Sequence, residues 1–576
     1  MSALIDTLTR RFDQGIVAAF GDEHAGTPPV LRRSNRADFQ ADVALGLGRK
    51  LGRPPREIAE ALVAKLDLAG LVEKVEIAGP GFVNLTLTGE WLAREVASAA
   101  ADPRLGVASE APETVVIDYS SPNVAKEMHV GHIRSTLIGD ALARVLEHVG
   151  HRVIRQNHLG DWGTPFGMLI EHVLDTSGGD ATSLSIRDLD VFYREARAKF
   201  DGDPAFAERS RRRVVLLQGG DPKTLELWRL LVELSTTYFE HIYERLGVGL
   251  RRRDVCSESF YNPMLAKVTD DLRAAGLLEE SDGAECVFAP GFTSKEGKPL
   301  PLIVRKTDGG FGYAATDLAG VRHRTATLGA TRLLYVVGAP QQQHLAMVFA
   351  VAAKAGWLVP PARATHVAFG SILGPDKKMF KTREGGTVKL ADLLDEAIAR
   401  ARAILEEKDP PHLDEAARRE VARMIGIGAL KYVDLSSDRV KDYVFDWNRM
   451  LAFDGNTAPY LQFAHARTRS ILRKAGEAGV ASGAVAVRTP EERALALALL
   501  GFGDAVAGVA ESLQPHRLCT YLFDLATATT SFLENCPVLK AEDDAARASR
   551  LALSDVAGKV LARGLALLGI EAPEAM

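Results

Sequence analysis

The chain of 576 residues is longer than one hydrophobic core usually covers, so we expect three or four domains. Its formal net charge of -5 is nearly balanced, which excludes a global positive field, so a nucleic acid would have to meet local basic faces. Four widely spaced cysteines argue against a zinc site and a disulfide framework alike, and the absence of a signal peptide or a long apolar run predicts a cytoplasmic protein without a membrane partner.

The N-terminal region has the pattern of a small separate α/β domain. Apolar residues first recur at helical spacing up to about Val17, and residues 37–66 then indicate two helices broken at Arg53 to Pro55. Residues 72–87 alternate like two strands around a Gly-Pro-Gly turn. The stretch from Asp102 to Ala111 is mostly polar or small, which is typical of a linker.

Residues 111–162 carry the densest chemistry. Val115 to Ile117 form an apolar run typical of a buried parallel strand, and a Ser/Pro/Asn loop follows. A helical pattern begins near Gly131 and ends at Gly150, which places His129 and His132 at a helix N-terminus.

Such a helix start is a ready anion site, because its first amides lack partners and the helix dipole favours negative charge. Two imidazoles there can donate to phosphate oxygens, Gly131 permits close approach to the backbone, and Lys126 adds a mobile charge. A lone histidine pair would more often simply cap or line a loop. The surrounding strand, loop and helix favour a phosphate site instead.

After Trp162 a polar, largely helical section extends to about Leu250. Its arginine clusters, at 209–213 and 251–253, are more typical of solvated faces than of RNA contacts. From Pro301 short strands (residues 302–320, then 331 onward) indicate the second half of a doubly wound sheet. Ligands bind such sheets where the winding reverses, so four polar residues could face the first unit across a cleft: Tyr313, Asp317, Gln341 and His344. The structural alternative for Asp317 is a helix-start residue.

Downstream, a loop carries Lys377, Lys378 and Lys381 and leads into an amphipathic helix. A lysine loop beside a phosphate site can neutralise charge that develops in a transition state, although such a loop alone is more often a solvated turn. From about Asp414 the pattern is nearly all helical. Thr489 and Glu492, with Pro490 between them, form a capping box, and a helix bundle closes the chain.

Several long segments resemble one family, in its order and across most of the chain. The segment PNVAKEMHVGH is similar to the HIGH signature of class I aminoacyl-tRNA synthetases, and its setting resembles the bacterial arginyl-tRNA synthetases. KMFKT, from Lys378 to Thr382, stands where the family has its KMSKS loop. Further similar segments are IRQNHLGDWGTPFG, YAATDLAG, the run from GIGALKYVDLSSD to TRSILRK, and PHRLCTYLFDLATATTSFLENCPVL.

The resemblance implies an α/β fold: a catalytic domain on a Rossmann-like doubly wound parallel sheet, a small N-terminal α/β domain and a C-terminal all-helical bundle. The implied boundaries are 1–108 for an N-terminal domain that contacts the tRNA D-loop, 109–390 for the catalytic domain with a helical insertion around 170–255, 391–452 for a helical stem, and 453–576 for the anticodon-binding domain.

The resemblance also implies the reaction. ATP and L-arginine give arginyl-adenylate and pyrophosphate, and the arginyl group then passes to the 3'-terminal adenosine of tRNA(Arg). Mg2+ accompanies ATP, no zinc is expected, and the family generally needs bound tRNA before it activates the amino acid. We expect a monomer without an obligate protein partner.

By resemblance, the catalytic residues are His129, His132, Lys126 and Lys381. The residues implied to bind ATP are Pro122, Asn123, Val130, Gly131, His132 and Lys381. The family pattern places Asp118, Tyr313, Asp317 and Gln341 around the arginine side chain, and Ser121 and Asn123 near its α-amino group. Carboxylates suit a planar guanidinium because they accept its paired donors.

For tRNA, Phe82 and Asn84 match the segment expected to read a D-loop base, because an aromatic platform and an amide edge suit an unstacked nucleotide. Their structural alternative is an ordinary strand. Tyr460 and the terminal Met576 resemble positions near the anticodon.

Two other functions share part of this pattern. A nucleotidylyltransferase of the HxGH kind would share the histidines but have no use for the long helical C-terminal region. A catalytically idle tRNA-binding paralogue would keep that region and lose the site, and the intact histidines, Asp118, Asp317 and Lys381 argue against it.

Overall fold

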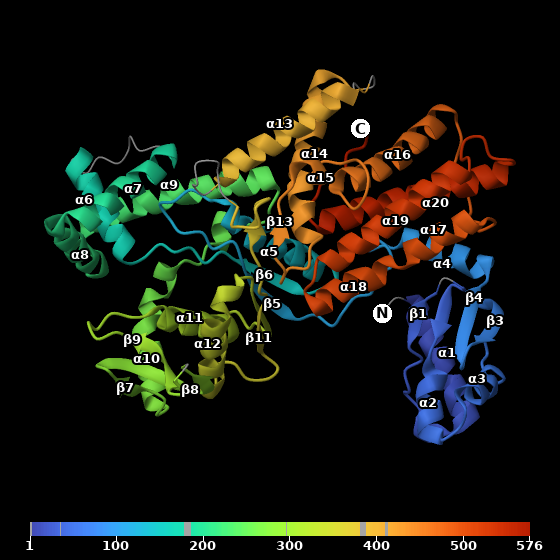
Figure 1. The fold of residues 1–576 in the computed structure, drawn as a ribbon, viewed down its shortest axis with the longest axis horizontal. Coiled ribbons are helices and arrows are strands. Elements are labelled where there is room, and N and C mark those ends of the chain that lie inside the picture. The colour runs from blue at the N-terminus through green and yellow to red at the C-terminus, as the bar shows by residue number, and fades with distance from the viewer. Residues whose placement is uncertain are drawn as a thin grey trace.

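The computed structural model describes residues 3–34, 36–177, 186–294, 296–380, 388–408, 410 and 413–576. Its parallel sheet lies near the middle of an elongated molecule, a helical insertion extends to one side, and the N-terminal unit lies beside the last helices of the chain (Figure 1). The predicted fold class is confirmed, because a parallel sheet core, an N-terminal domain and a C-terminal helical domain are all present.

The N-terminal unit is a four-stranded antiparallel sheet, in the order β1-β2-β4-β3, packed with helices. Its elements are α1 (Ala3–Phe20), η1 (Asp22–His24), β1 (Leu31–Arg33), β2 (Phe39–Ala41), α2 (Val43–Leu51), α3 (Pro55–Val63), β3 (Val72–Ala78), β4 (Phe82–Leu87) and α4 (Gly89–Ala101). The sequence placed Phe39 to Ala41 in a helical stretch. They form a strand instead, because pairing with β4 buries Phe39 and Ala41 on one face of the sheet.

The central sheet is parallel, with strand order β11-β10-β5-β6. Its elements, with the helices that follow the two central strands, are β5 (Thr114–Asp118), α5 (Val130–His148), β6 (Arg152–Gln156), β10 (Arg332–Tyr335), η5 (Ala339–Gln341), α12 (Gln342–Lys354) and β11 (Arg363–His366). The chain winds from β5 to β6 and later adds β10 and β11 on the other side, so the winding reverses between β5 and β10. Asp118 and Tyr335 pair there, at the carboxyl ends where ligands bind in such sheets.

Two insertions separate β6 from β10, and they lie at the left of Figure 1. The first comprises α6 (Thr164–Ser177), α7 (Ile186–Gly202), α8 (Pro204–Gln218) and α9 (Pro222–Leu246). The second comprises η2 (Arg252–Asp254), η3 (Glu258–Tyr261), α10 (Asn262–Ala274), β7 (Glu279–Ser281), β8 (Ala284–Thr293), β9 (Pro299–Arg305), α11 (Tyr313–Arg322) and η4 (His323–Thr327).

The expectation that residues 302–320 add strands to the doubly wound sheet is wrong. β9 pairs antiparallel with β8 in a separate three-stranded sheet, and the residues from Tyr313 onward form helix α11. A short apolar run shows that a strand forms but not which partner it pairs with. Asp317 therefore lies within a helix and not on a strand.

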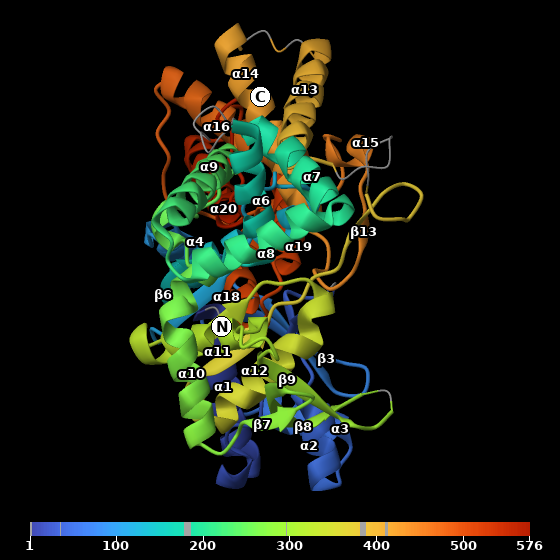
Figure 2. The same cartoon turned by 90° about the vertical axis from the view of Figure 1, so that its left-hand side faces the viewer.

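The C-terminal part is helical. Its elements are β12 (Ile372–Leu373), α13 (Leu390–Lys408), α14 (Glu415–Leu435), β13 (Tyr443–Val444), α15 (Trp447–Met450), α16 (Ala458–Glu477), α17 (Pro490–Leu500), α18 (Phe502–Ser512), α19 (His516–Asn535) and α20 (Asp544–Leu567). Figure 2 shows α13 and α14 side by side, projecting from the end of the molecule.

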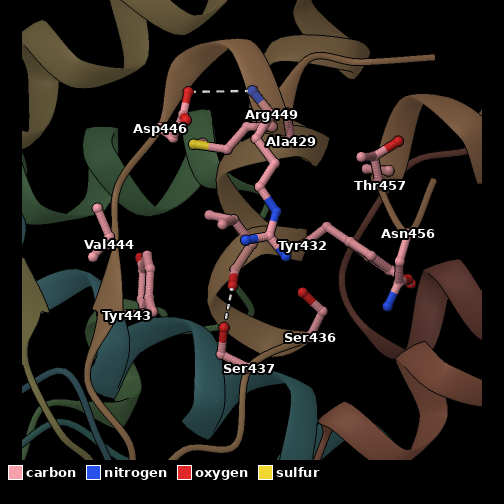
Figure 3. A pocket seen from close by; sticks show the side chains of 13 residues that line it. Ala429, Tyr432, Ser436, Ser437, Tyr443, Val444, Asp446, Arg449, Asn456 and Thr457 are labelled. Atoms are coloured by element: carbon pink, nitrogen blue, oxygen red, sulfur yellow. Dashed lines mark hydrogen bonds between the residues drawn. The ribbon is translucent and has the colours of Figure 1, made fainter. Parts of the chain in front are cut away.

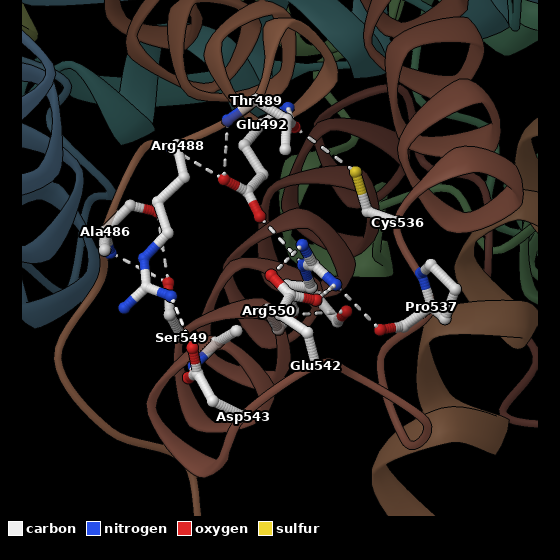
Figure 4. Close-up of polar contacts among 12 residues, drawn as sticks. Ala486, Arg488, Thr489, Glu492, Cys536, Pro537, Glu542, Asp543, Ser549 and Arg550 are labelled. Carbon is white, nitrogen blue, oxygen red and sulfur yellow. Dashed lines mark hydrogen bonds and ion pairs between the residues drawn. The ribbon is translucent and has the colours of Figure 1, made fainter.

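The predicted capping box of α17 is confirmed, and it leads into a buried ion pair. Glu492 accepts the Thr489 amide at 3.0 Å and also pairs with Arg550 of α20 at 2.8 Å, both charged side chains being almost fully buried (Figure 4). Arg550 also pairs with Glu542. Because a buried charge is costly without partners, this network fixes how α17 and α20 pack.

The segment Pro490–Ser512 is apolar and long enough to cross a membrane by length and composition alone. It consists of two helices that meet at Gly501, and these pack against α4, α5 and α19. Such packing is what core helices of a bundle show. The four cysteines are also buried, each as a free thiol.

Candidate active site

The loop after β5 has an unusual backbone. Ser120, Ser121 and Ala125 adopt positive φ angles of 73°, 47° and 63°, a region that costs residues other than glycine about 1 to 3 kcal/mol each. Three side-chain acceptors hold their amides at 2.9 to 3.0 Å, and these come from α5, the end of β6 and α9: Ser135, Asn157 and Ser235. The surrounding fold therefore fixes this loop in shape.

The histidine pair starts helix α5 as predicted. Nδ1 of His129 accepts the Gly131 amide at 3.0 Å, and Nδ1 of His132 accepts the His129 amide at 3.1 Å, a reciprocal capping box with ring centroids 4.0 Å apart. A neutral ring whose Nδ1 accepts a hydrogen bond carries its proton on Nε2. Both rings therefore present N–H donors at a helix end that favours anions.

His132 is neutral near pH 7. Burial, helped by the nearby His129 and Lys126, lowers the pKa of His132 to about 4. The capping and phosphate-binding explanations for the two histidines are thus compatible, because capping uses Nδ1 and leaves the proton on Nε2.

Lys126 lies shortly before the histidines, with its Nζ 4.2 Å from the ring centroid of Tyr193 of the helical insertion. Of the predicted ATP-binding residues, Pro122 and Val130 are buried, whereas Asn123 and Gly131 are exposed. Asn123 pairs with Gly160 in an isolated parallel bridge.

The predicted Lys381 lies outside the described residues, but both flanks of its loop are described. Before the loop, Phe380 stacks on Phe445 with ring centroids 4.6 Å apart. After it, the Val130 amide donates to the Val388 carbonyl at 2.9 Å. The described residues on either side are thus each held by a contact, and Val388 is held by the first residue of α5.

Helix α5 is also held from the C-terminal side. Arg134 Nε pairs with Asp434 Oδ2 of α14 at 3.1 Å, and both side chains are buried. Arg134 donates to the Lys441 carbonyl at 3.0 Å, just before β13, and β13 pairs with β12. β12 leads into the segment that carries Lys377 and Lys378. Helix α5 and this lysine segment therefore share one buried support.

The carboxylate of Asp118 is already paired inside the protein. Arg324 of η4 donates to Asp118 Oδ2 at 2.5 Å and to Gln156 Oε1 at 2.6 Å, while Ser121 Oγ donates to Asp118 Oδ1 at 3.2 Å. All except Ser121 are buried. Sequence reasoning missed Arg324, because it lies in a helical stretch without a motif and 206 residues from its partner.

Asp317 has a different environment. Its Oδ2 lies 2.6 Å from Nε2 of His344 on α12, and both side chains are partly exposed. The hydrogen bond that His344 donates to Asp317 raises the pKa of His344. Tyr313 is 75% exposed and Gln341 is exposed as well, so both have surface free for a ligand.

A second acidic group near Asp317 was not predicted. Burial and the neighbouring carboxylates of Asp161 and Asp317 raise the pKa of Glu258 to about 7. Asp161 is buried and accepts the Ser259 amide at 2.9 Å and the Ser259 hydroxyl at 2.6 Å. The tripeptide Ser-Glu-Ser gave no signal, since only the fold brings it close to α11.

The predicted tRNA-binding residues belong to the N-terminal unit and to the C-terminal helices. Phe82 and Asn84 are on β4, where Phe82 is partly exposed and Asn84 only 4% exposed, with its Oδ1 lacking a hydrogen-bond partner among the described residues. Tyr460 is in the first turn of α16, and the side chain of Met576 packs against the helical core.

A cavity of about 300 Å³ opens between α14, β13 and the start of α16, and Figure 3 shows Arg449 reaching into it toward Tyr432. No predicted site residue lines it. Within the described ranges, no group of three His, Cys, Asp or Glu side chains is arranged to hold a metal ion.

Three family models and full-length relatives match this chain. Residues 95–447 match the family described as tRNA synthetases class I (R), catalytic domain; residues 461–576 match the DALR anticodon binding domain; and residues 6–87 match the arginyl tRNA synthetase N terminal domain. The arginine--tRNA ligase of Thermobifida fusca is 54% identical over 571 residues, which is 99% of each chain.

Solved structures agree. The arginyl-tRNA synthetases of Plasmodium falciparum and Thermus thermophilus superpose with TM-scores of 0.85 and 0.80 at 27% and 28% identity, covering 100% of both chains. The match to an anticodon-binding domain removes the nucleotidylyltransferase alternative. The chain therefore belongs to the class I arginyl-tRNA synthetases, the enzymes that use ATP to join L-arginine to tRNA(Arg).

Proposed function

We propose that the cleft between the carboxyl ends of β5 and β10 forms arginyl-adenylate. The carboxylate of arginine attacks the α-phosphorus of ATP, the bond to the β-phosphate oxygen breaks, and pyrophosphate leaves. A hydroxyl of the 3'-terminal adenosine of tRNA then attacks the arginyl carbonyl, and AMP leaves. The observation that carries this proposal is the histidine pair with both Nδ1 atoms occupied, since it presents two Nε2–H donors at a helix start.

In the phosphate half, His129 and His132 donate to phosphate oxygens and stabilise the charge that develops on them, with Lys126 and Lys381 as additional cations. Val130 and Gly131 supply the helix-start backbone, and the loop residues Pro122 and Asn123 border the nucleotide. Mg2+ would accompany ATP, held mainly by phosphate oxygens and water, and would neutralise phosphate charge.

In the arginine half, Asp317 and Glu258 accept the guanidinium, with Tyr313 and Gln341 beside it. Two observations support this pair: Glu258 has Asp317 among the neighbours that raise its pKa, and Asp317 is partly exposed. Asp118 acts through its neighbours, because Arg324 already occupies one of its oxygens.

The other oxygen of Asp118 orients Ser121, which with Asn123 holds the α-amino group of arginine. Lysine would leave buried acceptors unpaired in the arginine half, at a cost of about 1 to 3 kcal/mol each.

For tRNA, Phe82 and Asn84 contact the D-loop, and Tyr460 and Met576 lie at the anticodon end. The unpartnered amide oxygen of Asn84 is the feature that supports a ligand at β4.

We divide the chain into domains at residues 108, 390 and 452, and place it in the cytoplasm as a monomer. Buried free thiols fit that reducing compartment.

The test is pyrophosphate exchange with several amino acids, each with and without tRNA(Arg). The expected result is exchange that prefers arginine and requires tRNA. Exchange without either property would overturn the proposal, and an absence of exchange would mark an idle tRNA-binding paralogue.

A sharper test separates the two halves of the cleft. Asp317→Ala should raise the KM for arginine and leave the KM for ATP unchanged. Equal loss of both would assign Asp317 a purely structural role.

A further inference from the structure

The N-terminal unit and the C-terminal helices meet at a partly buried ion pair. Arg493 of α17 donates through Nε to Asp38 Oδ1 at 3.1 Å and through Nη2 to Asp38 Oδ2 at 2.8 Å. Nη2 also donates to the Leu87 carbonyl. The side chain of Asp38 is only 8% exposed, and its Oδ2 accepts the Leu87 amide at 2.7 Å. One arginine thus holds two separate segments of the N-terminal unit.

One of these segments is the end of β4, the strand that carries Phe82 and Asn84, and the other leads into its neighbour β2. Asp38 immediately precedes β2, Leu87 ends β4, and β2 pairs with β4 so that Gln40 lies opposite Asn84. Leu87 is three residues from Asn84, about 10 Å along an extended strand. Arg493 therefore contacts the end of β4 but not its predicted tRNA-binding positions.

Other contacts keep the same interface closed. Arg33 of β1 donates to the Leu497 carbonyl of α17 at 2.5 Å, and α4 packs along α17, as Figure 1 shows. At Gly89, the first residue of α4, an added Cβ would lie 3.0 Å from the Val487 carbonyl oxygen. The interface is close-packed, and the ion pair between Arg493 and Asp38 crosses it.

We propose that Arg493 is a positioning residue for tRNA selection: it fixes the N-terminal unit on the anticodon-binding domain, so that the D-loop contact and the anticodon contact lie at a set separation. The inference rests on the proposed tRNA contacts of β4. A bidentate arginine–carboxylate pair suits this task because it fixes direction as well as distance. Arg493 itself does not touch tRNA.

The first test measures the separation of the two domains in the full-length enzyme. All four native cysteines are buried, so spin labels can be directed to cysteines introduced at Glu60 and Lys559, which are exposed on α3 and α20. The expected result is a narrow distance distribution in the parent that broadens in Arg493→Ala. An unchanged distribution would overturn the proposal, whatever the tRNA contacts are.

The second test is a double-mutant cycle in aminoacylation. Arg493→Ala should raise the KM for tRNA(Arg) about tenfold while kcat at saturating tRNA and the KM for ATP stay unchanged. Phe82→Ala should raise the same KM. The double variant should be little worse than Arg493→Ala alone, because a displaced Phe82 already contributes little to tRNA binding. Fully multiplicative effects would contradict the inference.

Controls separate positioning from stability. Arg488→Ala removes an ion pair with Asp543 inside the helical domain, 3.0 Å long, and should leave the KM for tRNA unchanged. Arg493→Lys should recover only part of the loss, since one ammonium cannot replace the two-point contact. If Phe82→Ala has no effect while Arg493→Ala still broadens the distance distribution, the proposed D-loop contact is contradicted. The role of Arg493 in fixing the N-terminal unit on the helical domain is then still supported.

Discussion

The phosphate half and the arginine half of the cleft are built in different ways. In the phosphate half, a strained loop and two histidines are tied by hydrogen bonds before any ligand arrives. In the arginine half, Tyr313 and Gln341 are exposed and Asp317 is partly exposed, and Glu258 has a raised pKa. The phosphate half is held in shape by hydrogen bonds within the protein. The arginine half holds repelling acids that a cation would stabilise, so binding of arginine itself would complete it.

The largest effect should come from the buried pair that borders both halves. Arg324→Met leaves the Asp118 charge buried without its partner, which should lower the free energy of unfolding by about 3 to 5 kcal/mol. Chemical denaturation followed by circular dichroism measures this loss. Arg324→Met combined with Asp118→Asn should recover part of it, and a double variant as unstable as the single one would refute the buried-charge explanation.

The phosphate half can be broken at His132. His132→Asn retains an acceptor for the His129 amide but lacks the Nε2–H donor, so pyrophosphate exchange should fall about 100- to 1,000-fold while the melting temperature stays close to the parent value. His132→Ala, which loses both functions, should also melt lower. Full exchange activity in the asparagine variant would show that His132 only caps the helix.

The arginine half should respond to pH through Glu258. Its pKa of about 7 means that the free enzyme holds a proton there below neutrality, and a bound guanidinium favours the ionised carboxylate. The KM for arginine should therefore fall about tenfold from pH 6 to pH 8. Glu258→Gln should have a higher KM that no longer changes with pH. A parent KM that is flat over this range would separate Glu258 from arginine binding.

The smallest effect should come from the Asp317–His344 pair, because both side chains are partly exposed and solvent screens them. Asp317 raises the pKa of His344, so the stabilisation is present below pH 6.5 and is lost as the pH rises through the raised value. Asp317→Asn should cost below about 1 kcal/mol at pH 6 and less at pH 8. A larger loss at pH 8 than at pH 6 would reverse the assigned charge state.

Local patterns predicted individual elements well, in the catalytic domain and in the C-terminal helices. The apolar strand, the helix that starts at the histidines and the capping box at Thr489 each depend on residues within one or two turns, and the structure has all three. In the arginine half, the sheet pattern and the family resemblance both pointed to Tyr313, Asp317 and Gln341, whereas no local pattern pointed to Glu258. Its raised pKa depends on Asp161 and Asp317, two carboxylates that are distant in the sequence, so no periodicity in the sequence reports it.

The sequence by itself therefore determined most of the elements, the helix-start histidines and, through resemblance, the family. Only the tertiary structure decided which charges meet: Arg324 with Asp118 across 206 residues and Arg493 with Asp38 across 455. It also decided that β9 joins a separate sheet. The physical reason is that side-chain period and capping are local, whereas the partner of a buried charge or a strand edge is fixed by long-range packing.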